Sequence, residues 1–326
     1  MRTIEYRMVL PFTVKEFRRG LLLQYLDTME RIYSSEDVGA DGLILLNRTA
    51  TTHVLHGPGV VVDRIWIMDR YLPAFFRFLF GNLIIREHNV SFPGYTNSAY
   101  RLDGWNEFLV HVETLVLEDD DGHIENVFGH DEAMQRNRKV RYLDLSRGPN
   151  ETKSSGGRFD QEMRHVFDFD PSTHTFTDKS GTSRGPFSAG WVIGVKERGG
   201  SYCCVYRSVS VKCPGLFGGF IKNKIYSYFE LGFMNYHLKM VYDGTRVCAS
   251  TVAMLQQMEE SVVQHQIERS RAFLAGQGES RHPIINNEDL SVDQSSTLTS
   301  TIQSDEEEAG EENFAETFDS FATHTQ

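Results

Sequence analysis

The order of the periodic segments constrains the fold of this chain more than any other feature. Segments in which apolar and polar side chains alternate, the pattern of β-strands, dominate the first two-thirds of the sequence. Segments with apolar residues three or four apart, the pattern of amphipathic helices, follow near 221–240 and 250–274. Runs of strands followed by runs of helices are typical of α+β folds. We therefore expect one curved antiparallel sheet gripped by long helices.

The strands are expected throughout the first two-thirds of the chain. The first alternates Ile4 and Tyr6 with Glu5 and Arg7, ends at Pro11, and is expected to be buried on one face only. Further strands are expected over residues 41–47, 50–56, 61–68, 83–92, 95–102, 106–117, 138–145 and 201–212.

Two helices are expected among these strands. Thr13 and Glu16 have the spacing of a capping box, with Thr13 as N-cap, and open an amphipathic helix over 14–33. A short, very apolar helix is expected over 73–80, because proline is favoured in the first helical turn. The region 147–186 is rich in Gly, Ser, Thr, Asp and Pro, which indicates a long, mostly irregular segment.

The charge of the chain is concentrated at one end. The sequence has a net charge of −12, and residues 283–326 contain 11 acidic residues and no Lys or Arg. The remainder is nearly neutral, so sequence-independent nucleic-acid binding is not expected, because it needs a basic surface. We divide the chain into a folded domain over 1–275 and an acidic tail over 276–326 that we expect to be disordered.

Signals for an enzyme or a metal site are weak. The sequence contains none of the short motifs of serine hydrolases, zinc proteases or nucleotide-binding enzymes. His53 and His56 have a spacing that could meet a metal only with further ligands, and we interpret them as loop or strand histidines. Cys203 and Cys204 are adjacent, which does not suit a redox pair. We expect no catalytic residues, no metal and no cofactor.

Polar residues on apolar strand faces are the most informative feature for function. Alternation places Thr114, Arg207 and Arg64 each on an otherwise apolar face of its strand. A buried, unpaired charge costs several kcal/mol or more, so each arginine needs an anion or must reach water. A phosphate group inside the sheet fits the guanidinium fork. As alternatives, Arg64 can point past the sheet edge, Arg207 can pair with a carboxylate or lie on the outer face, and Thr114 can be a satisfied core hydroxyl.

The loop between the last expected strand and the helix near 221–240 carries two large apolar residues. Leu216 and Phe217 lie between glycines there. Exposed apolar loop tips can insert into membranes. The alternative is that both side chains cap the core at the start of the helix.

Seven segments of the chain resemble the phosphatidylinositol transfer protein family. In order they are 4–11 (IEYRMVLP), 72–77 (LPAFFR), 108–114 (FLVHVET), 125–127 (ENV), 184–186 (RGP) with Trp191, 235–237 (NYH) and 258–260 (MEE). The resemblance covers roughly residues 3–275. It implies a START-like helix-grip fold that encloses one phospholipid with the headgroup innermost. It also implies exchange of phosphatidylinositol and phosphatidylcholine between membranes without covalent chemistry, so that the lipid is cargo and not a cofactor.

The resemblance also assigns roles to individual residues. It implies that Thr114 and Arg207 lie near the lipid phosphate, that Arg64, Glu260, Asn89 and Ser91 lie at the headgroup, that Tyr236 lines the lipid channel, and that Leu216 and Phe217 dock to membranes. Trp66, on the strand face of Arg64, is expected to line the channel as well.

Three positions depart from the family pattern or conflict with the helix period. Val62 and Val90 stand where the family has inositol-contacting Thr and Asn, so inositol selectivity is expected to be weakened, whereas phosphate binding is not. Glu260 matches an inositol-contacting glutamate, but the stripe of Leu255 and Met258 places it on the opposite helix face. A solvated surface glutamate is therefore the alternative.

The sequence predicts a monomeric phospholipid transfer protein in the cytoplasm that contacts membranes transiently. The chain opens with no recognisable targeting signal. The alternative is a phospholipid sensor or presenter that acts through a protein partner. Residues 305–322 loosely resemble the acidic-flanked peptide that binds endoplasmic-reticulum receptors, although a purely solvating tail is the simpler interpretation.

Overall fold

A single large sheet organises the computed structural model, which describes residues 2–34, 41–68, 84–147, 169–215 and 218–277. Its strands lie in the order β2-β3-β4-β5-β6-β10-β1-β7. Their bounds are β1 Arg2–Leu10, β2 Asp41–His53, β3 Gly57–Met68, β4 Ile84–Phe92, β5 Tyr95–Leu102, β6 Trp105–Glu118, β7 Arg138–Tyr142 and β10 Cys203–Lys212. All neighbouring pairs are antiparallel except β1 and β7, which are parallel. The expected α+β class is confirmed, with one parallel pair in the sheet.

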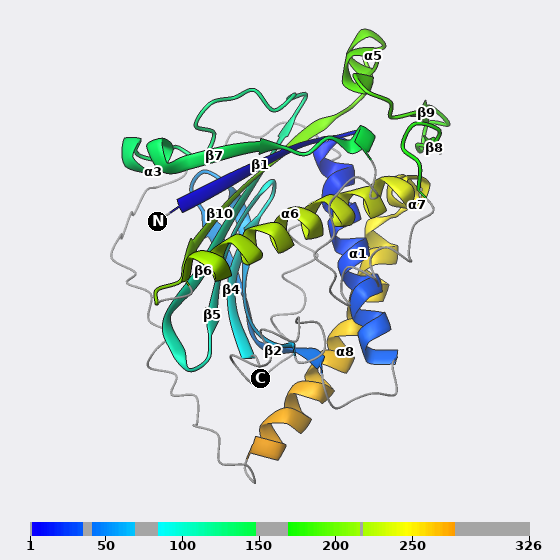
Figure 1. Ribbon diagram of the computed structural model, residues 1–326. Coiled ribbons are helices and arrows are strands. Elements are labelled where there is room, and N and C mark those ends of the chain that lie inside the picture. The colour runs from blue at the N-terminus through cyan, green and yellow to red at the C-terminus, as the bar shows by residue number, and fades with distance from the viewer. Residues whose placement is uncertain (1, 35–40, 69–83, 148–168, 216–217, 278–326) are drawn as a thin grey trace.

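Three long helices lie beside one face of this curved sheet (Figure 1). They are α1 Val14–Ser34, α6 Gly218–Tyr242 and α8 Val252–Gln277. Shorter elements are α3 Glu132–Asn137, the 3-10 turn Leu145–Arg147, the hairpin of β8 Phe176–Thr177 and β9 Ser183–Arg184, α5 Trp191–Glu197 and α7 Gly244–Ala249. No helix in the described part of the chain is long and apolar enough to cross a membrane.

Two of the expected strands differ from the structure. The strands expected over 41–47 and 50–56 form one strand, β2, whose register shifts between Leu45 and Asn47. That irregularity interrupts the alternation and made one strand look like two. The helix expected over 73–80 lies outside the described residues. The boundary expected at 275 lies two residues before the end of α8 at Gln277 and stays a prediction.

The start of α1 has the expected capping box. The backbone N–H of Glu16 donates to Thr13 Oγ1 (3.1 Å), and the N–H of Thr13 donates to Glu16 Oε2 (2.8 Å). Glu16 has a second function that the motif does not predict. Arg184 Nη1 donates to Glu16 Oε2 (2.7 Å) and so ties β9 to the start of α1. This ion pair holds the pKa of the Glu16 carboxyl below its usual range against the opposing effect of burial.

The expectation that β1 is buried on one face only is wrong. Glu5 and Arg7, on the polar face, are as fully buried as Ile4 and Tyr6. Arg7 Nε donates to Glu5 Oε1 (2.7 Å), and Arg138 Nη1 donates to Glu5 Oε2 (2.7 Å). Arg7 also donates to the carbonyl of Gly122 (2.6 Å), in the segment that follows β6 and covers this face. Alternation shows which side chains share a face but cannot show that a later segment covers it.

Removal of the Glu5 carboxylate tests this buried cluster. The Glu5→Ala variant leaves Arg7 and Arg138 without their shared anion in the interior, so we expect it to lower the free energy of unfolding by about 3–5 kcal/mol. The control is Glu132→Ala, because Glu132 pairs with Arg136 where both side chains are largely exposed. That change should cost about 0.5 kcal/mol or less. Urea unfolding of both variants measures the difference, and similar losses would contradict the assignment.

Candidate functional site

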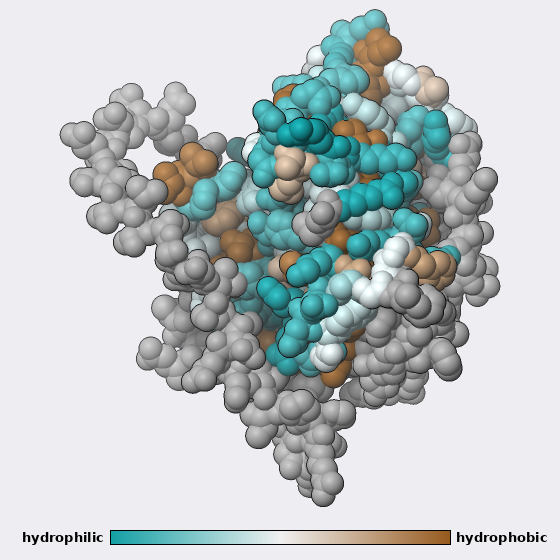
Figure 2. Space-filling view, turned by 60° about the vertical axis from the view of Figure 1, so that its left-hand side comes forward, coloured by the Kyte–Doolittle hydropathy of each residue, from teal (hydrophilic) through white to brown (hydrophobic). Residues whose placement is uncertain are grey.

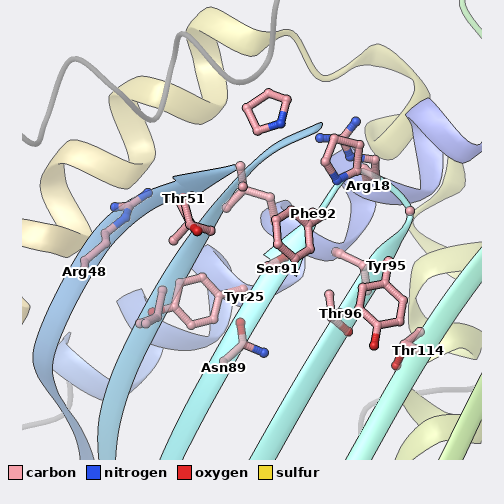
Figure 3. Close-up of a pocket in the computed structure, with 18 of the residues that line it drawn as sticks. Arg18, Tyr25, Arg48, Thr51, Asn89, Ser91, Phe92, Tyr95, Thr96 and Thr114 are labelled. Atoms are coloured by element: carbon pink, nitrogen blue, oxygen red, sulfur yellow. The ribbon is translucent and has the colours of Figure 1, made fainter. Parts of the chain in front are cut away.

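A pocket of about 390 Å³ lies between the sheet and two of the long helices. Side chains of β2 to β6 and of β10 form one wall, and residues of α1 and α8 form the other. Figure 3 shows Asn89, Thr96 and Thr114 projecting from neighbouring strands toward the same side, with Tyr25 of α1 nearby. The pocket therefore lies on the helix-covered face of the sheet, where apolar side chains alone would be expected.

A row of side chains crosses the sheet at the pocket. The strand register pairs Val60 with Ser91, Ser91 with Thr96, Thr96 with Thr114, and Thr114 with Arg207. Directly paired residues point to the same face of a sheet. All five residues line the pocket. The structure thus brings Thr114 and Arg207 together, as the alternation of each strand predicts, and extends the polar wall to Ser91 and Thr96.

Arg207 is a partly buried cation with no ion-paired carboxylate among the described residues. Its Nε donates to Thr114 Oγ1 (2.9 Å), and its guanidinium lies 4.0 Å from the centroid of the Phe233 ring. Burial lowers the pKa of Arg207 to about 10, and no carboxylate is among the groups that act on it. The side chain still carries its charge at neutral pH. A buried charge of this kind is stabilised by an anion that enters the pocket.

Arg64 also lines the pocket, but an internal carboxylate lies close to it. Arg64 Nη1 lies 3.7 Å from Glu87 Oε2. Glu87 also accepts hydrogen bonds from Trp66 Nε1 (2.6 Å) and from the hydroxyl of Tyr100 (3.2 Å). Arg64 therefore points inward, not past the sheet edge, and its charge is partly balanced. Trp66 positions Glu87 and is not among the described residues that line this pocket.

The polar residues expected at the headgroup are present on β4. Asn89 and Ser91 both line the pocket, next to Val62 of β3. The Asn89 amide donates to Ser98 Oγ (2.6 Å), which fixes its orientation on the sheet. The wall beside Val62 therefore offers an amide and hydroxyl groups to a ligand, although Val62 itself offers none.

The glutamate on α8 that enters the pocket is Glu259 and not Glu260. Glu260 is exposed, whereas Glu259 is 6 % exposed and lines the pocket. Arg48 Nη2 of β2 donates to Glu259 Oε1 (2.8 Å), which links α8 to the edge of the sheet. Helical spacing from Leu255 and Val262 could have indicated Glu259, because these residues share one helix face, but the sequence analysis did not draw that inference.

Two further arginines line the pocket that the sequence analysis missed. Arg18 comes from α1 and Arg48 from β2. Burial lowers the pKa of Arg18. With Arg64 and Arg207, the described lining contains four arginines and one carboxylate, that of Glu259. Arg48 follows the register shift in β2, so simple alternation along the strand could not predict on which face of the sheet its side chain lies. The pocket carries excess positive charge and therefore favours an anionic ligand.

Comparison with known proteins identifies the family. The family model for phosphatidylinositol transfer proteins matches residues 1–264. The chain belongs to the phosphatidylinositol transfer protein family. The resemblance seen in the sequence is confirmed, and the mixed α+β architecture is consistent with it.

Three relatives show how distant the individual similarities are. Cytoplasmic phosphatidylinositol transfer protein 1 of Xenopus tropicalis is 24 % identical over 209 residues, 64 % of this chain and 56 % of that protein. Phosphatidylinositol transfer protein 4 of Dictyostelium discoideum is 26 % identical over 152 residues, 46 % of this chain and 44 % of that protein. Protein retinal degeneration B of Drosophila melanogaster is 27 % identical over 190 residues, 58 % of this chain and 14 % of that protein. The chain thus spans about half the length of the first two.

The remaining residues to which the family resemblance assigns roles are not among the described lining residues of this pocket. The Tyr236 hydroxyl donates to the carbonyl of Leu21 (3.0 Å), and Tyr236 is not among the described lining residues. Leu216, Phe217 and residues 278–326 of the acidic tail lie outside the described residues.

The two histidines with a possible metal spacing contact each other. His53 and His56 stack with ring centroids 4.8 Å apart. Within the described chain, no three or more His, Cys, Asp or Glu side chains are grouped to hold a metal ion.

His237 is a further buried polar residue beside the pocket. It stacks on Phe17, which lines the pocket, with ring centroids 5.8 Å apart. Neither ring nitrogen has a hydrogen-bond partner in the described structure. Burial, with a smaller contribution from the charge of Arg207, lowers the pKa of His237 to about 3. The imidazole is therefore neutral in the folded protein at physiological pH.

The depressed pKa of His237 predicts an acid-sensitive contribution to stability. The unfolded state binds the proton below about pH 6.5 and the folded state only near pH 3, so stability falls as the pH drops through this window. Between pH 7 and pH 5 the loss from this group should be about 2 kcal/mol. We expect His237→Phe to remove that loss, as measured by urea unfolding at both pH values.

The control is His123→Phe, because His123 is exposed. This variant should keep the pH dependence of the unchanged protein. If His237→Phe also keeps it, the imidazole is not held neutral by burial.

Proposed function

We propose that the chain binds one phospholipid, phosphatidylinositol or phosphatidylcholine, in this pocket and exchanges it between membranes. The observation that carries the proposal is Arg207, a partly buried cation bonded to Thr114 with no ion-paired carboxylate among the described residues. A phosphodiester supplies the missing negative charge, and its oxygens suit both the guanidinium fork and a hydroxyl donor. Membership of the family supports the same ligand.

The headgroup beyond the phosphate would meet the polar wall of β4 and the end of α8. Asn89 and Ser91 offer hydrogen bonds, and Glu259 with Arg48 offers a paired acceptor and donor. We assign to Glu259 the headgroup contact that the sequence suggested for Glu260. Arg64, partly balanced by Glu87, would contribute hydrogen bonds more than net charge.

The proposal includes no covalent step and no cofactor. Transfer of two acyl chains from a bilayer into an apolar cavity changes their free energy little, because about 0.8 kcal/mol per CH₂ is gained on either side. Headgroup contacts then decide which lipid is carried. We propose a monomer in the cytoplasm that contacts membranes transiently, with Leu216 and Phe217 as one point of contact.

A role as sensor or presenter has no support among the described residues. A contact between the acidic tail and an endoplasmic-reticulum receptor stays a prediction, because residues 278–326 lie outside the described chain.

Loss of the Arg207 charge tests the phosphate site. The Arg207→Gln variant removes the cation that the phosphodiester would neutralise, so we expect bound phospholipid to fall at least tenfold, since a charge-assisted hydrogen bond contributes about 1.5–3 kcal/mol. Native mass spectrometry with lipid extraction measures the occupancy. Thr114→Val should lower the occupancy less, because it removes only the hydroxyl.

The control is Arg101→Gln, because Arg101 is exposed on β5 and is not among the described lining residues. It should keep full occupancy. Near-ultraviolet circular dichroism confirms that each variant is folded. A folded Arg207→Gln protein that still carries phospholipid would refute the assignment.

Restoring a hydroxyl at position 62 tests the source of headgroup selectivity. Val62 lines the pocket, and Val62→Thr adds a hydroxyl where an inositol ring would lie. One hydrogen bond contributes about 1 kcal/mol, so the ratio of bound phosphatidylinositol to phosphatidylcholine should rise about fivefold. Loading from mixed vesicles followed by lipid extraction measures the ratio. Val61→Thr, on the opposite face of β3, should leave it unchanged, and the same rise in both variants would exclude a direct contact.

A further inference from the structure

The hairpin between β2 and β3 carries the two most exposed large hydrophobic residues of the described chain. Val54 is 79 % exposed and Leu55 is 83 % exposed, and they are adjacent at the tip. On the side of the molecule that Figure 2 shows, hydrophobic residues lie in small separate patches among hydrophilic ones. Single exposed hydrophobic residues need no explanation, but two adjacent ones that project together do.

A hydrogen bond and several ring contacts hold the base of the hairpin tip. The N–H of Leu55 donates to His53 Nδ1 (3.2 Å), which closes the turn. The His56 ring stacks on His53 and on Tyr95, with centroids 4.8 Å and 4.5 Å away. His53 also contacts the ring of Phe92 at 5.4 Å. Because this aromatic cluster fixes the turn, the two apolar side chains cannot fold back onto the protein without breaking it.

The end of the hairpin and the neighbouring β4–β5 turn contain no charged residue of their own, although the Tyr95 hydroxyl donates to Glu113 of β6 (3.0 Å). No Asp, Glu, Lys or Arg occurs between Arg48 and Asp63, or over residues 89–100, which include the neighbouring β4–β5 turn. A carboxylate near the tip would oppose contact with an anionic membrane surface, and any charged group would have to be dehydrated. Tyr95, in the base of the tip, is also of a residue type enriched at membrane interfaces. The end of the hairpin, with two exposed apolar side chains and no charged residue of its own, is therefore suited to insertion into the interface of a bilayer.

The shape of the tip also favours a bilayer over a protein partner. A stable protein interface buries more than about 1,000 Å² with good complementarity. Two side chains on a narrow projection offer far less, whereas a bilayer accepts an isolated apolar projection into its interface. The hairpin also borders the candidate lipid pocket, because Thr52, Pro58 and Phe92 line it. A membrane bound at the tip therefore lies next to the pocket.

We propose that Val54 and Leu55, at the tip of the β2–β3 hairpin, insert into the interface of a phospholipid bilayer. The hairpin borders the β4–β5 turn, and Tyr95, the first residue of β5, pairs with Leu115, which pairs with Tyr206 of β10. Lys212, at the end of β10, pairs with Leu109, so this contact lies toward the other end of β10. It is therefore separate from the docking proposed for Leu216 and Phe217. The inference extends the proposed function but does not depend on which lipid is carried.

The test uses the full chain and vesicles of phosphatidylcholine and phosphatidylserine. We expect the double variant Val54→Ser with Leu55→Ser to bind vesicles about tenfold more weakly in a flotation assay, because it removes the apolar groups that insert. The matched control is Ile193→Ser on α5, where the side chain is 64 % exposed and not among the described lining residues of the pocket. The control should bind as the unchanged protein does. Equal binding by all three proteins overturns the proposal.

A second variant reports insertion directly. Leu55→Trp places a fluorophore at the tip, and the spectrum of the unchanged protein, which has three Trp, is subtracted. We expect a blue shift on addition of vesicles and quenching by brominated lipid chains. No quenching, or a loss of self-association in the serine variant in place of a loss of vesicle binding, overturns the proposal.

Cargo is measured separately, so that the two proposals can fail independently. The double serine variant should keep its bound phospholipid in native mass spectrometry. A parallel loss of cargo would assign the tip to the pocket and overturn the inference. An unchanged protein that binds vesicles through the tip but never carries lipid would leave this inference standing and refute the proposed function.

Discussion

The hydrogen bond between Arg207 and Thr114 is the interaction on which the candidate site depends. It joins two antiparallel strands at one register position, and both side chains reach the helix-covered face. The row continues through Thr96 and Ser91, so a line of polar groups crosses the helix-covered face of the sheet. Such a row is costly in a dry core, because each group needs a partner and the guanidinium needs a counter-charge. Helices α1 and α8 close over the row and make it the wall of a pocket.

A comparison of three buried or partly buried arginines shows why Arg207 is the one to interpret as a ligand-binding group. Arg7 has Glu5 at 2.7 Å and belongs to a cluster that holds the segment after β6 against the sheet. Arg64 has Glu87 at 3.7 Å, and Glu87 in turn is held by two aromatic donors. Arg207 has a hydroxyl and an aromatic ring. Burial alone therefore does not separate structural arginines from binding ones, whereas the presence or absence of an internal carboxylate does.

The sequence predicted the parts of the fold and site that depend on local periodicity. The capping box, the strand faces of Thr114 and Arg207 and the order of strands and helices all follow from residues close together in the chain. What could not be predicted depends on contacts between distant segments. The cover over Glu5 comes from residues more than 100 positions away, and the register shift in β2 reverses the face on which Arg48 lies. Glu259 was not predicted for a different reason. Its spacing from Leu255 and Val262 would have placed it on the buried face of the helix, but the similarity to the family motif drew attention to Glu260.

The lack of an internal counter-charge at Arg207 also affects how lipid exchange would proceed. An empty pocket leaves the partly buried guanidinium without an anion, which is unfavourable. Under the proposed function, release of one lipid into water is opposed both by the exposure of its acyl chains and by this unpaired charge. Exchange at a membrane avoids the empty state, because an incoming phosphate can replace the outgoing one while the protein is bound. A membrane contact beside the pocket, such as the Val54–Leu55 tip, shortens the path between the bilayer surface and Arg207, so the position of the tip and the unpaired charge favour the same one-for-one mechanism.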